Sequence, residues 1–256
     1  MNLPRHLISQ ISDFKFQISR ALTALLALTG PLFAATPSAP ADPGLPYVYT
    51  KWQQFTTKDG LPNDHIFAVK SDPDRNSVWI GTEDGLAQFD KATGKFEVWQ
   101  EKDGLPWRVV TAIEVDRRTG DLWLGLFGGG LARFSAGRFD HFHQLNSGLV
   151  NDVVYAVTTE GDHIWCATTA GASRYNLKTD KWDIFTEVNA PMEEIWNYNI
   201  SANEKEGKVH LAVWGSGILE FDTKTENWKT YLDPDGEMEI DLRSEERRVG
   251  KECRSR

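Results

Sequence analysis

Aromatic, acidic and amide residues recur in turn-like segments of this sequence, between short apolar runs, and their chemistry suits ligand binding. Aromatic rings stack on planar or sugar-like molecules, and a nearby arginine adds a charge and hydrogen-bond donors. The candidate ligand-binding residues are Asn63, Asp64, Glu83, Asp84, Trp107, Arg108, Phe127, Asn151, Asp152, Glu193, Glu194, Trp196 and Trp214. The alternative is that these side chains pack against a neighbouring repeat or a missing partner domain.

One turn imitates a calcium loop. Asp72, Asp74 and Asn76, followed by Glu83, have the spacing of EF-hand ligands. Ser77, however, stands where that loop needs glycine for its sharp turn, and no flanking helices are predicted. We therefore predict an ordinary turn over residues 72–76.

Two other groups of residues could hold a metal ion. The segment from Asp233 to Asp241 is rich in carboxylates and could bind calcium, but it fits equally a turn into a following strand. His141 and His143 lie on one face of a predicted strand without a third ligand in reach. We predict no metal site and no cofactor.

Catalytic motifs are missing from the sequence. It has no Ser-His-Asp order, nucleotide loop or Cys pair, and Gly128-Gly129-Gly130 lacks the following helix and Lys of a phosphate loop. We therefore predict that the protein is not an enzyme. The alternatives are a secreted enzyme of the lyase or hydrolase type, with Glu193, Glu194 and His210 as first catalytic candidates, or a stand-alone binding or adhesion protein.

The candidate segments recur because the chain contains four copies of one repeat, about 44 residues apart. The first copy reads Asp59-Gly60-Leu61-Pro62-Asn63-Asp64, then Val78-Trp79-Ile80-Gly81-Thr82, Gly85-Leu86-Ala87-Gln88-Phe89-Asp90 and Phe96-Glu97-Val98-Trp99. The copies span residues 47–99, 100–142, 143–185 and 186–231, and a further copy begins at 232–242. A repeat of this length with four short apolar runs is typical of one blade of a β-propeller.

Within a copy the apolar residues alternate with period two, which predicts strands and not helices. In the first copy we expect strands over residues 65–70, 78–82, 86–89 and 95–99. The predicted fold is all-β: a propeller of four-stranded antiparallel blades, with four blades and the start of a fifth in an open, incomplete ring. In a propeller, the turns between blades and between second and third strands share one face, so the candidate ligand-binding residues should meet there.

The repeated tryptophans are expected in the core. Trp79, Trp123 and Trp165 hold one position of the repeat, and His210 replaces them in the fourth copy. Large flat side chains suit the packing of blade on blade. Cys166, next to Trp165, is expected to be a small buried core residue.

Both ends of the sequence differ from the repeats. Residues 1–34 combine basic residues, an apolar run and small residues, as in a secretory signal peptide, and residues 35–46 form a Pro/Ala-rich spacer. Residues 243–256 look like a translated short-read sequencing adapter. The alternative is a natural basic tail. We expect the native sequence to continue beyond residue 242 in a way that this chain does not show.

The repeat region is strongly acidic. The whole chain has a net charge of −9, and removing residues 1–34 (net +2) and 243–256 (net +3) leaves −14. Sequence-independent nucleic-acid binding depends on neutralising phosphates with Lys and Arg. The charge therefore argues against a nucleic-acid partner.

The motifs quoted for the first copy, above all Asp59 to Asp64, Trp79 to Thr82 and Gly85 to Asp90, resemble the two-component regulator propeller repeat. The resemblance covers residues 47–242 and is most specific in the first two copies. In the third, Ala167-Thr168 replaces Gly-Thr, and the fourth lacks the Gly-Leu-Pro turn.

This resemblance implies the front part of a periplasmic sensor propeller of a bacterial hybrid two-component system. It implies export, a small-molecule or carbohydrate-like ligand, and a downstream signalling output. The implied partners are the missing C-terminal blades and signalling domains, and the resemblance also allows a dimer and an inner-membrane anchor for the full-length protein.

Overall fold

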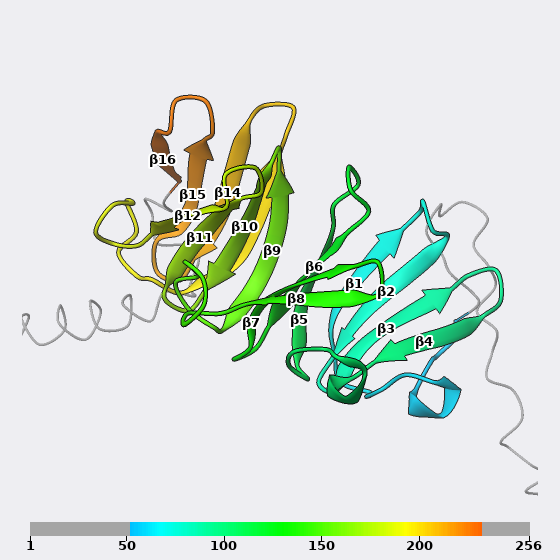
Figure 1. Ribbon diagram of the computed structural model, residues 1–256. Helices are drawn as coiled ribbons and strands as arrows, with labels where there is room; N and C mark the ends of the chain where they lie inside the picture. The colour runs from blue at the N-terminus through cyan, green and yellow to red at the C-terminus, as the bar shows by residue number, and fades with distance from the viewer. Residues whose placement is uncertain (1–51, 232–256) are drawn as a thin grey trace, which may run out of the picture. The chain divides into compact units, whose positions relative to one another are not determined.

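Four antiparallel sheets follow one another along the part of the chain that the structure, a computed structural model, describes, which is residues 52–231 (Figure 1). Each sheet has four strands in sequence order, so each copy of the repeat forms one blade. The predicted signal peptide (1–34), the spacer (35–46), the beginning of the first copy (47–51), the start of a fifth blade (232–242) and the tail (243–256) lie outside the described residues.

The blades have closely similar strands. Blade 1 comprises β1 (Ile66–Asp72), β2 (Ser77–Thr82), β3 (Gly85–Asp90) and β4 (Lys95–Trp99). Blade 2 comprises β5 (Val110–Val115), β6 (Leu122–Leu126), β7 (Gly130–Ser135) and β8 (Arg138–Phe142). Blade 3 comprises β9 (Val154–Glu160), β10 (His163–Thr168), β11 (Gly171–Asn176) and β12 (Lys181–Phe185). Blade 4 comprises β13 (Asn197–Asn203), β14 (Lys208–Val213), β15 (Gly217–Asp222) and β16 (Trp228–Tyr231). The first strands β1, β5, β9 and β13 of successive blades lie beside one another and are called inner strands below.

The strands of blade 1 agree with the sequence prediction to within one or two residues. The main difference is Asp72, predicted in a turn but found at the end of β1, paired with Ser77 of β2. Its buried carboxylate accepts hydrogen bonds from the side chain of Arg75 (2.7 Å) and the indole of Trp79 (3.1 Å). These bonds fix Asp72 in the sheet, and the turn begins only at Pro73.

A short 3₁₀ turn precedes each of the first two blades. η1 (Thr57–Asp59) and η2 (Glu101–Asp103) end at Gly60 and Gly104, whose φ angles of 116° and 96° lie in the left-handed region. Glycine adopts this conformation without a steric penalty. The glycine of the Asp-Gly-Leu-Pro motif therefore ends each 3₁₀ turn. The leucine that follows each glycine is buried.

The core lies between blades. Three apolar clusters join blade 1 to 2, blade 2 to 3 and blade 3 to 4, and each contains one repeated tryptophan of the earlier blade. Trp79, Trp123 and Trp165 are fully buried, as predicted. Trp107 and Trp196 are not, because they stand in the turns between blades, where solvent reaches them.

Cys166 is buried in the strand β10, as predicted, and burial strongly raises the pKa of its thiol. The thiol therefore stays protonated and unreactive. In blade 4, His210 takes the tryptophan position and contacts Glu220 through its Nε2 (3.3 Å). In the segment 52–231 no helix is long and apolar enough to cross a membrane.

The carboxyl group of Asp72 makes the stability of the protein depend on pH in the acidic range. Burial alone would raise the pKa of Asp72, but the hydrogen bonds from Arg75 and Trp79 outweigh burial and lower it. A lowered pKa in the folded state stabilises the protein above the unfolded pKa of about 3.9, and this contribution is lost as pH falls through the folded value. We expect the melting temperature of the native protein to drop below pH 4 more steeply than that of Asp72→Asn.

Thermal unfolding between pH 7 and pH 3 measures the effect. Asp74→Asn, at an exposed carboxylate in the following turn, is the control and should keep the native pH profile. Identical profiles for the native protein and Asp72→Asn would show that Asp72 does not contribute.

Candidate functional site

Every inner strand carries a β-bulge at the same place, one residue after the strand begins. The pairing with the second strand skips one residue in each blade. These skipped residues are Phe67, Thr111, Tyr155 and Tyr198. A bulge twists the strand locally and redirects a side chain, and bulges are frequent next to binding sites.

A second repeated contact brings the turn residues next to the bulges. The residue after each second strand donates its backbone N–H to the carbonyl of the residue just before the inner strand, at distances of 2.8–3.3 Å. The pairs are Glu83 with His65, Phe127 with Val109, Thr169 with Val153, and Trp214 with Trp196. The sequence prediction that these turns share one end of the blades therefore agrees with the backbone geometry.

Five aromatic side chains form a continuous surface at this end of blades 2 to 4, called the aromatic surface below. Phe127 contacts Tyr155 with 6.0 Å between ring centroids, and Tyr155 contacts Tyr198 at 5.2 Å. Tyr198 also contacts Trp214 at 5.5 Å and Trp196 at 6.3 Å. Phe127, Trp196 and Tyr198 are exposed, so solvent reaches their rings.

Three of these five residues, Phe127, Trp196 and Trp214, are among the sequence candidates. Tyr155 and Tyr198 are not, although they connect the other three. From the sequence, a tyrosine inside a strand with alternating apolar residues is expected to face the core. The bulges change the direction of these two side chains and bring them to the surface. The signal that could have found them is the alignment of the four inner strands, in which Phe67, Tyr155 and Tyr198 share one position.

Trp107 lies close to the turn after Phe127, and its side chain packs on the backbone of that turn. A Cβ atom built on Gly129 would come within 2.3 Å of the Trp107 Cβ, so the indole stem packs directly on this glycine. Gly128 and Gly129 therefore make room for Trp107. Arg108, the next candidate, is exposed.

The amide and acidic candidates mostly hold the turns together. Asn63 and Asn151 each accept the backbone N–H two residues later, at 2.7 and 2.8 Å. Asp64 accepts the backbone N–H of Thr57 at 2.7 Å, and Asp152 accepts that of Gln144 at 2.8 Å. Asp84 accepts from Gln100 at 3.1 Å. Side chains committed to local turns are less available to a ligand.

The remaining acidic candidates fall in two places. Glu83 lies in blade 1, where its Oε2 is 2.8 Å from the Nδ1 of His65. The five residues of the aromatic surface belong to blades 2 to 4. Glu193 and Glu194 donate their backbone N–H groups to the buried hydroxyl of Ser216, at 2.8 and 3.1 Å. This contact ties the segment before β13 to the turn that carries Trp214.

Asn197 is a polar residue that the sequence did not single out. It begins β13 between Trp196 and Tyr198, where the equivalent residues of blades 2 and 3 are the buried Val110 and Val154. Its Nδ2 donates to the carbonyl of Ile195, but its buried Oδ1 has no hydrogen-bond partner among the described residues. An unsatisfied buried acceptor destabilises a fold by about 1–3 kcal/mol. Its place between Trp196 and Tyr198, two residues of the aromatic surface, marks this end of blade 4 as a functional candidate.

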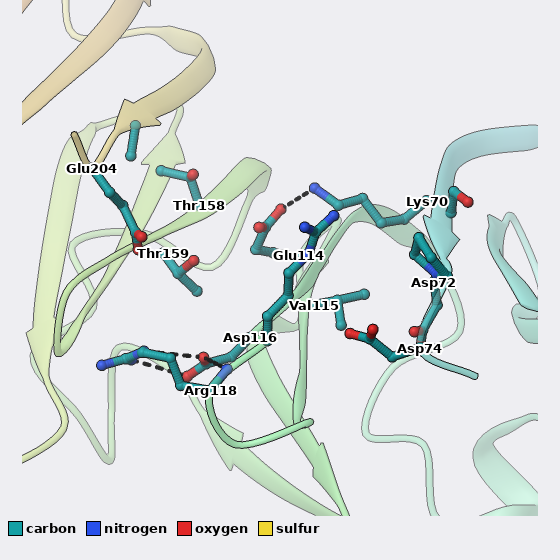
Figure 2. Close-up of a pocket in the computed structure, with 14 residues that line it drawn as sticks. Lys70, Asp72, Asp74, Glu114, Val115, Asp116, Arg118, Thr158, Thr159 and Glu204 are labelled. Atoms are coloured by element: carbon teal, nitrogen blue, oxygen red, sulfur yellow. Dashed lines mark hydrogen bonds and ion pairs between the residues drawn. The ribbon is translucent and has the colours of Figure 1, made fainter. Parts of the chain in front are cut away.

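A cavity of about 310 Å³ lies at the other end of the inner strands (Figure 2). All four blades contribute to it, and its charged groups include the ion pairs Lys70–Glu114 (2.5 Å) and Arg118–Asp116 (3.1 Å). Asp74 and Glu204 also face it. None of the sequence candidates lines this cavity. No cluster of three or more metal-ligating side chains occurs within residues 52–231.

Comparison with solved structures supports the architecture. The extracellular domain of BT3049 from B. thetaiotaomicron, described as a hybrid two component system, matches 71% of this chain with a TM-score of 0.61 and 17% identity. The extracellular domain of BT4673 from the same organism, described as a one component system, matches 71% with a TM-score of 0.51 and 18% identity. The WD40 repeats of RRP9 match 65% with a TM-score of 0.54 and 9% identity.

The described chain is part of a β-propeller. At these identities the likeness shows the fold alone. The matched parts make up 26% of the BT3049 domain, 31% of the BT4673 domain and 51% of the RRP9 chain, so this propeller segment spans a quarter to a half of those chains. No family model and no curated protein matches the sequence.

Proposed function

We propose that this chain is the front part of an exported sensor propeller, and that it binds a small, carbohydrate-like ligand on the aromatic surface to regulate a signalling output elsewhere in the same protein. The repeat motifs resemble those of sensor propellers, and two similar structures are extracellular domains of signalling systems. Of the three catalytic candidates, His210 on β14 contacts Glu220 on the neighbouring strand β15 at 3.3 Å, a contact within the sheet of blade 4.

The observation that carries the proposal is the chain of ring contacts from Phe127 to Trp214. Exposed aromatic residues in contact across three blades leave apolar area in water that a ligand can cover. The hydroxyl groups of Tyr155 and Tyr198 add polar edges, as sugar recognition requires both stacking and hydrogen bonding. A carbohydrate presents apolar C–H faces and hydroxyl edges, and it matches both features.

The test is calorimetric titration of the chain with a panel of neutral and acidic oligosaccharides. For a sugar that binds, we expect Tyr198→Ala and Trp214→Ala each to weaken the affinity about tenfold or more, equivalent to ~1.4 kcal/mol. Phe67→Ala is the matched control, because Phe67 occupies the same bulge in blade 1, outside the aromatic surface.

Native affinity in both aromatic variants, combined with lost binding in Glu114→Gln, would move the site to the charged cavity and contradict the proposal. No binding by any sugar of the panel would contradict the ligand class.

A further inference from the structure

The turn between β6 and β7, residues 127–130, supports a second aromatic side chain besides Phe127. Gly128 and Gly129 both contact Trp107. A Cβ on Gly129 would lie 2.3 Å from the Cβ of Trp107, and a Cβ on Gly128 would lie 3.6–3.8 Å from three atoms of its indole ring. The indole therefore lies along the backbone of the two glycines.

The ring of Trp107 is also open to solvent. The residue is 41% exposed, whereas the core tryptophans Trp79, Trp123 and Trp165 are 3% exposed or less. An indole that packs on rigid backbone and still meets water offers a fixed apolar surface, on which the C–H face of a sugar ring can stack.

Trp107 and Arg108 replace two residues that hold turns in the neighbouring blades. Blades 1 and 3 have Asn63-Asp64 and Asn151-Asp152 at these positions. Each of these asparagines accepts the backbone N–H two residues later, and each of these aspartates accepts a backbone N–H of the preceding turn. Tryptophan and arginine side chains have no acceptor, so blade 2 gives up both bonds. Proteins break a local rule in this way mostly at functional sites.

Arg108 brings a positive charge to this end of blade 2. It is exposed and precedes Val109, whose carbonyl accepts the backbone N–H of Phe127 at 3.1 Å. A guanidinium group binds a carboxylate through two parallel hydrogen bonds. The acidic residue Asp152 also adjoins the turn, but its carboxylate accepts the backbone N–H of Gln144. Arg108 is therefore a charge that the carboxylate of a ligand can use.

Two histidines at the end of β8 border the same glycines. The Nε2 of His141 lies 2.6 Å from the carbonyl oxygen of Gly129 and therefore donates to it. The rings of His141 and His143 are 4.9 Å apart between centroids, and the Nδ1 of His143 accepts the backbone N–H of Leu145 at 3.3 Å. Because this Nδ1 accepts, the Nε2 of His143 carries the proton and is a donor. His143 thus offers a hydrogen bond to an anion, and no lone pair to a metal ion.

We propose that Trp107, Arg108 and His143, called the uronate subsite below, bind one uronic acid unit of the saccharide ligand. The sugar ring stacks on Trp107, and its carboxylate accepts hydrogen bonds from the guanidinium of Arg108 and the Nε2 of His143. This inference rests on the proposed function, because the adjoining sugar units lie on the aromatic surface, which begins at Phe127 in the same turn.

Calorimetric titration with uronic acid trisaccharides tests the proposal. The panel contains galacturonate, glucuronate and mannuronate trisaccharides, each with its own methyl ester, which keeps the sugar rings and removes the negative charge. We expect at least one acid to bind the 256-residue chain about tenfold or more tightly than its ester, equivalent to ~1.4 kcal/mol.

Single variants assign this preference to the subsite. Trp107→Ala should weaken the binding of that acid about tenfold or more. Arg108→Gln and His143→Phe should each reduce the preference for the acid and leave the affinity for the ester unchanged. Arg117→Gln is the matched control for net charge, because it removes an exposed arginine of blade 2 at the cavity end of the inner strands, and it should keep the native affinity.

A double variant separates binding from folding. Trp107→Asn combined with Arg108→Asp installs the pair that blades 1 and 3 carry. We expect it to lose the preference for the acid and to melt within roughly 4 °C of the native protein, the shift that about 1 kcal/mol produces in a chain of this size. A much lower melting temperature would assign the two residues to the fold and overturn the proposal, as would a preference for the acid that persists.

The inference and the proposed function fail separately. If no acid binds more tightly than its ester, or if the preference survives Arg108→Gln and His143→Phe, the uronate subsite is wrong. A neutral sugar whose binding depends on Tyr198 and Trp214 would then still support the aromatic surface. If an acid depends on Arg108 but Tyr198→Ala and Trp214→Ala bind it normally, the aromatic surface is contradicted and the uronate subsite is supported.

Discussion

Replacing Trp165 with alanine is expected to lower the free energy of unfolding by about 3–5 kcal/mol, the range for truncating a fully buried tryptophan. Its indole is 0% exposed and stacks on Phe185 with 5.3 Å between centroids and 13° between planes. It also contacts Phe221 of blade 4 at 5.3 Å. The truncation therefore opens a cavity between blades 3 and 4.

Arg174 adds to this effect. Its guanidinium lies 5.5 Å from the Trp165 ring and pairs with Asp183 of blade 3 and Glu226 of blade 4. Without the indole the arginine loses a cation–π contact of about 0.5–1 kcal/mol or more, while both ion pairs remain. Trp165→Phe should destabilise much less, because it keeps an aromatic ring and removes an indole N–H that has no hydrogen-bond partner in the described chain.

Urea unfolding followed by circular dichroism measures both variants. Trp196→Ala, which removes a half-exposed indole from a turn, is the control and should change the stability by less than about 1 kcal/mol. A loss below about 1 kcal/mol in Trp165→Ala would show that the interface between blades 3 and 4 does not hold the fold.

Gly130→Ala is expected to destabilise the protein by about 2–5 kcal/mol, through two effects that a comparison with a matched glycine separates. Gly130 has a φ of +77°, and a Cβ there would lie 2.3 Å from the carbonyl oxygen of Phe142. Gly137, in the next hairpin, has a φ of +78° with nothing within 4 Å of a Cβ. Alanine pays the left-handed strain of about 1–2 kcal/mol at both positions, but only at Gly130 must the backbone of β8 also move, for a further 1–3 kcal/mol.

Thermal and urea unfolding of the two variants side by side give the comparison. Equal losses would mean that the strand end at Phe142 can shift freely. The prediction extends to Gly171, where a Cβ would lie 2.3 Å from the carbonyl oxygen of Phe185, the equivalent atom in blade 3.

The sequence allowed the blades to be predicted because each strand leaves a local signal. Apolar alternation and the glycines at turns place β4 at Lys95–Trp99 without error, and the shared position of Trp79, Trp123 and Trp165 identifies the core. These features depend on neighbours in the sequence. The fold was therefore predictable blade by blade.

The site was predictable only in part, because its geometry depends on pairing register. A bulge has no residue signature here: Phe67, Thr111, Tyr155 and Tyr198 belong to three residue types. The cavity depends on four strand ends that meet from distant repeats. By contrast, the turn-holding role of Asn63 and Asn151 could be predicted, since an asparagine in a turn commonly accepts the backbone N–H two residues later, here just before the strand begins.

The residue at the bulge of each inner strand takes no part in the pairing with the second strand, so its side chain can change without changing the pairing. A bulged residue has no partner in the strand ladder, so the side chains of Phe67, Tyr155 and Tyr198 can be exchanged with little effect on the pairing around them. Thr111 is the exception, because its hydroxyl donates to the carbonyls of Gly125 and Val154. On the proposed binding surface, mutation at Tyr155 and Tyr198 can therefore diversify specificity while the strand pairing stays the same. A library randomised at these two codons would sample new binders on an unchanged scaffold.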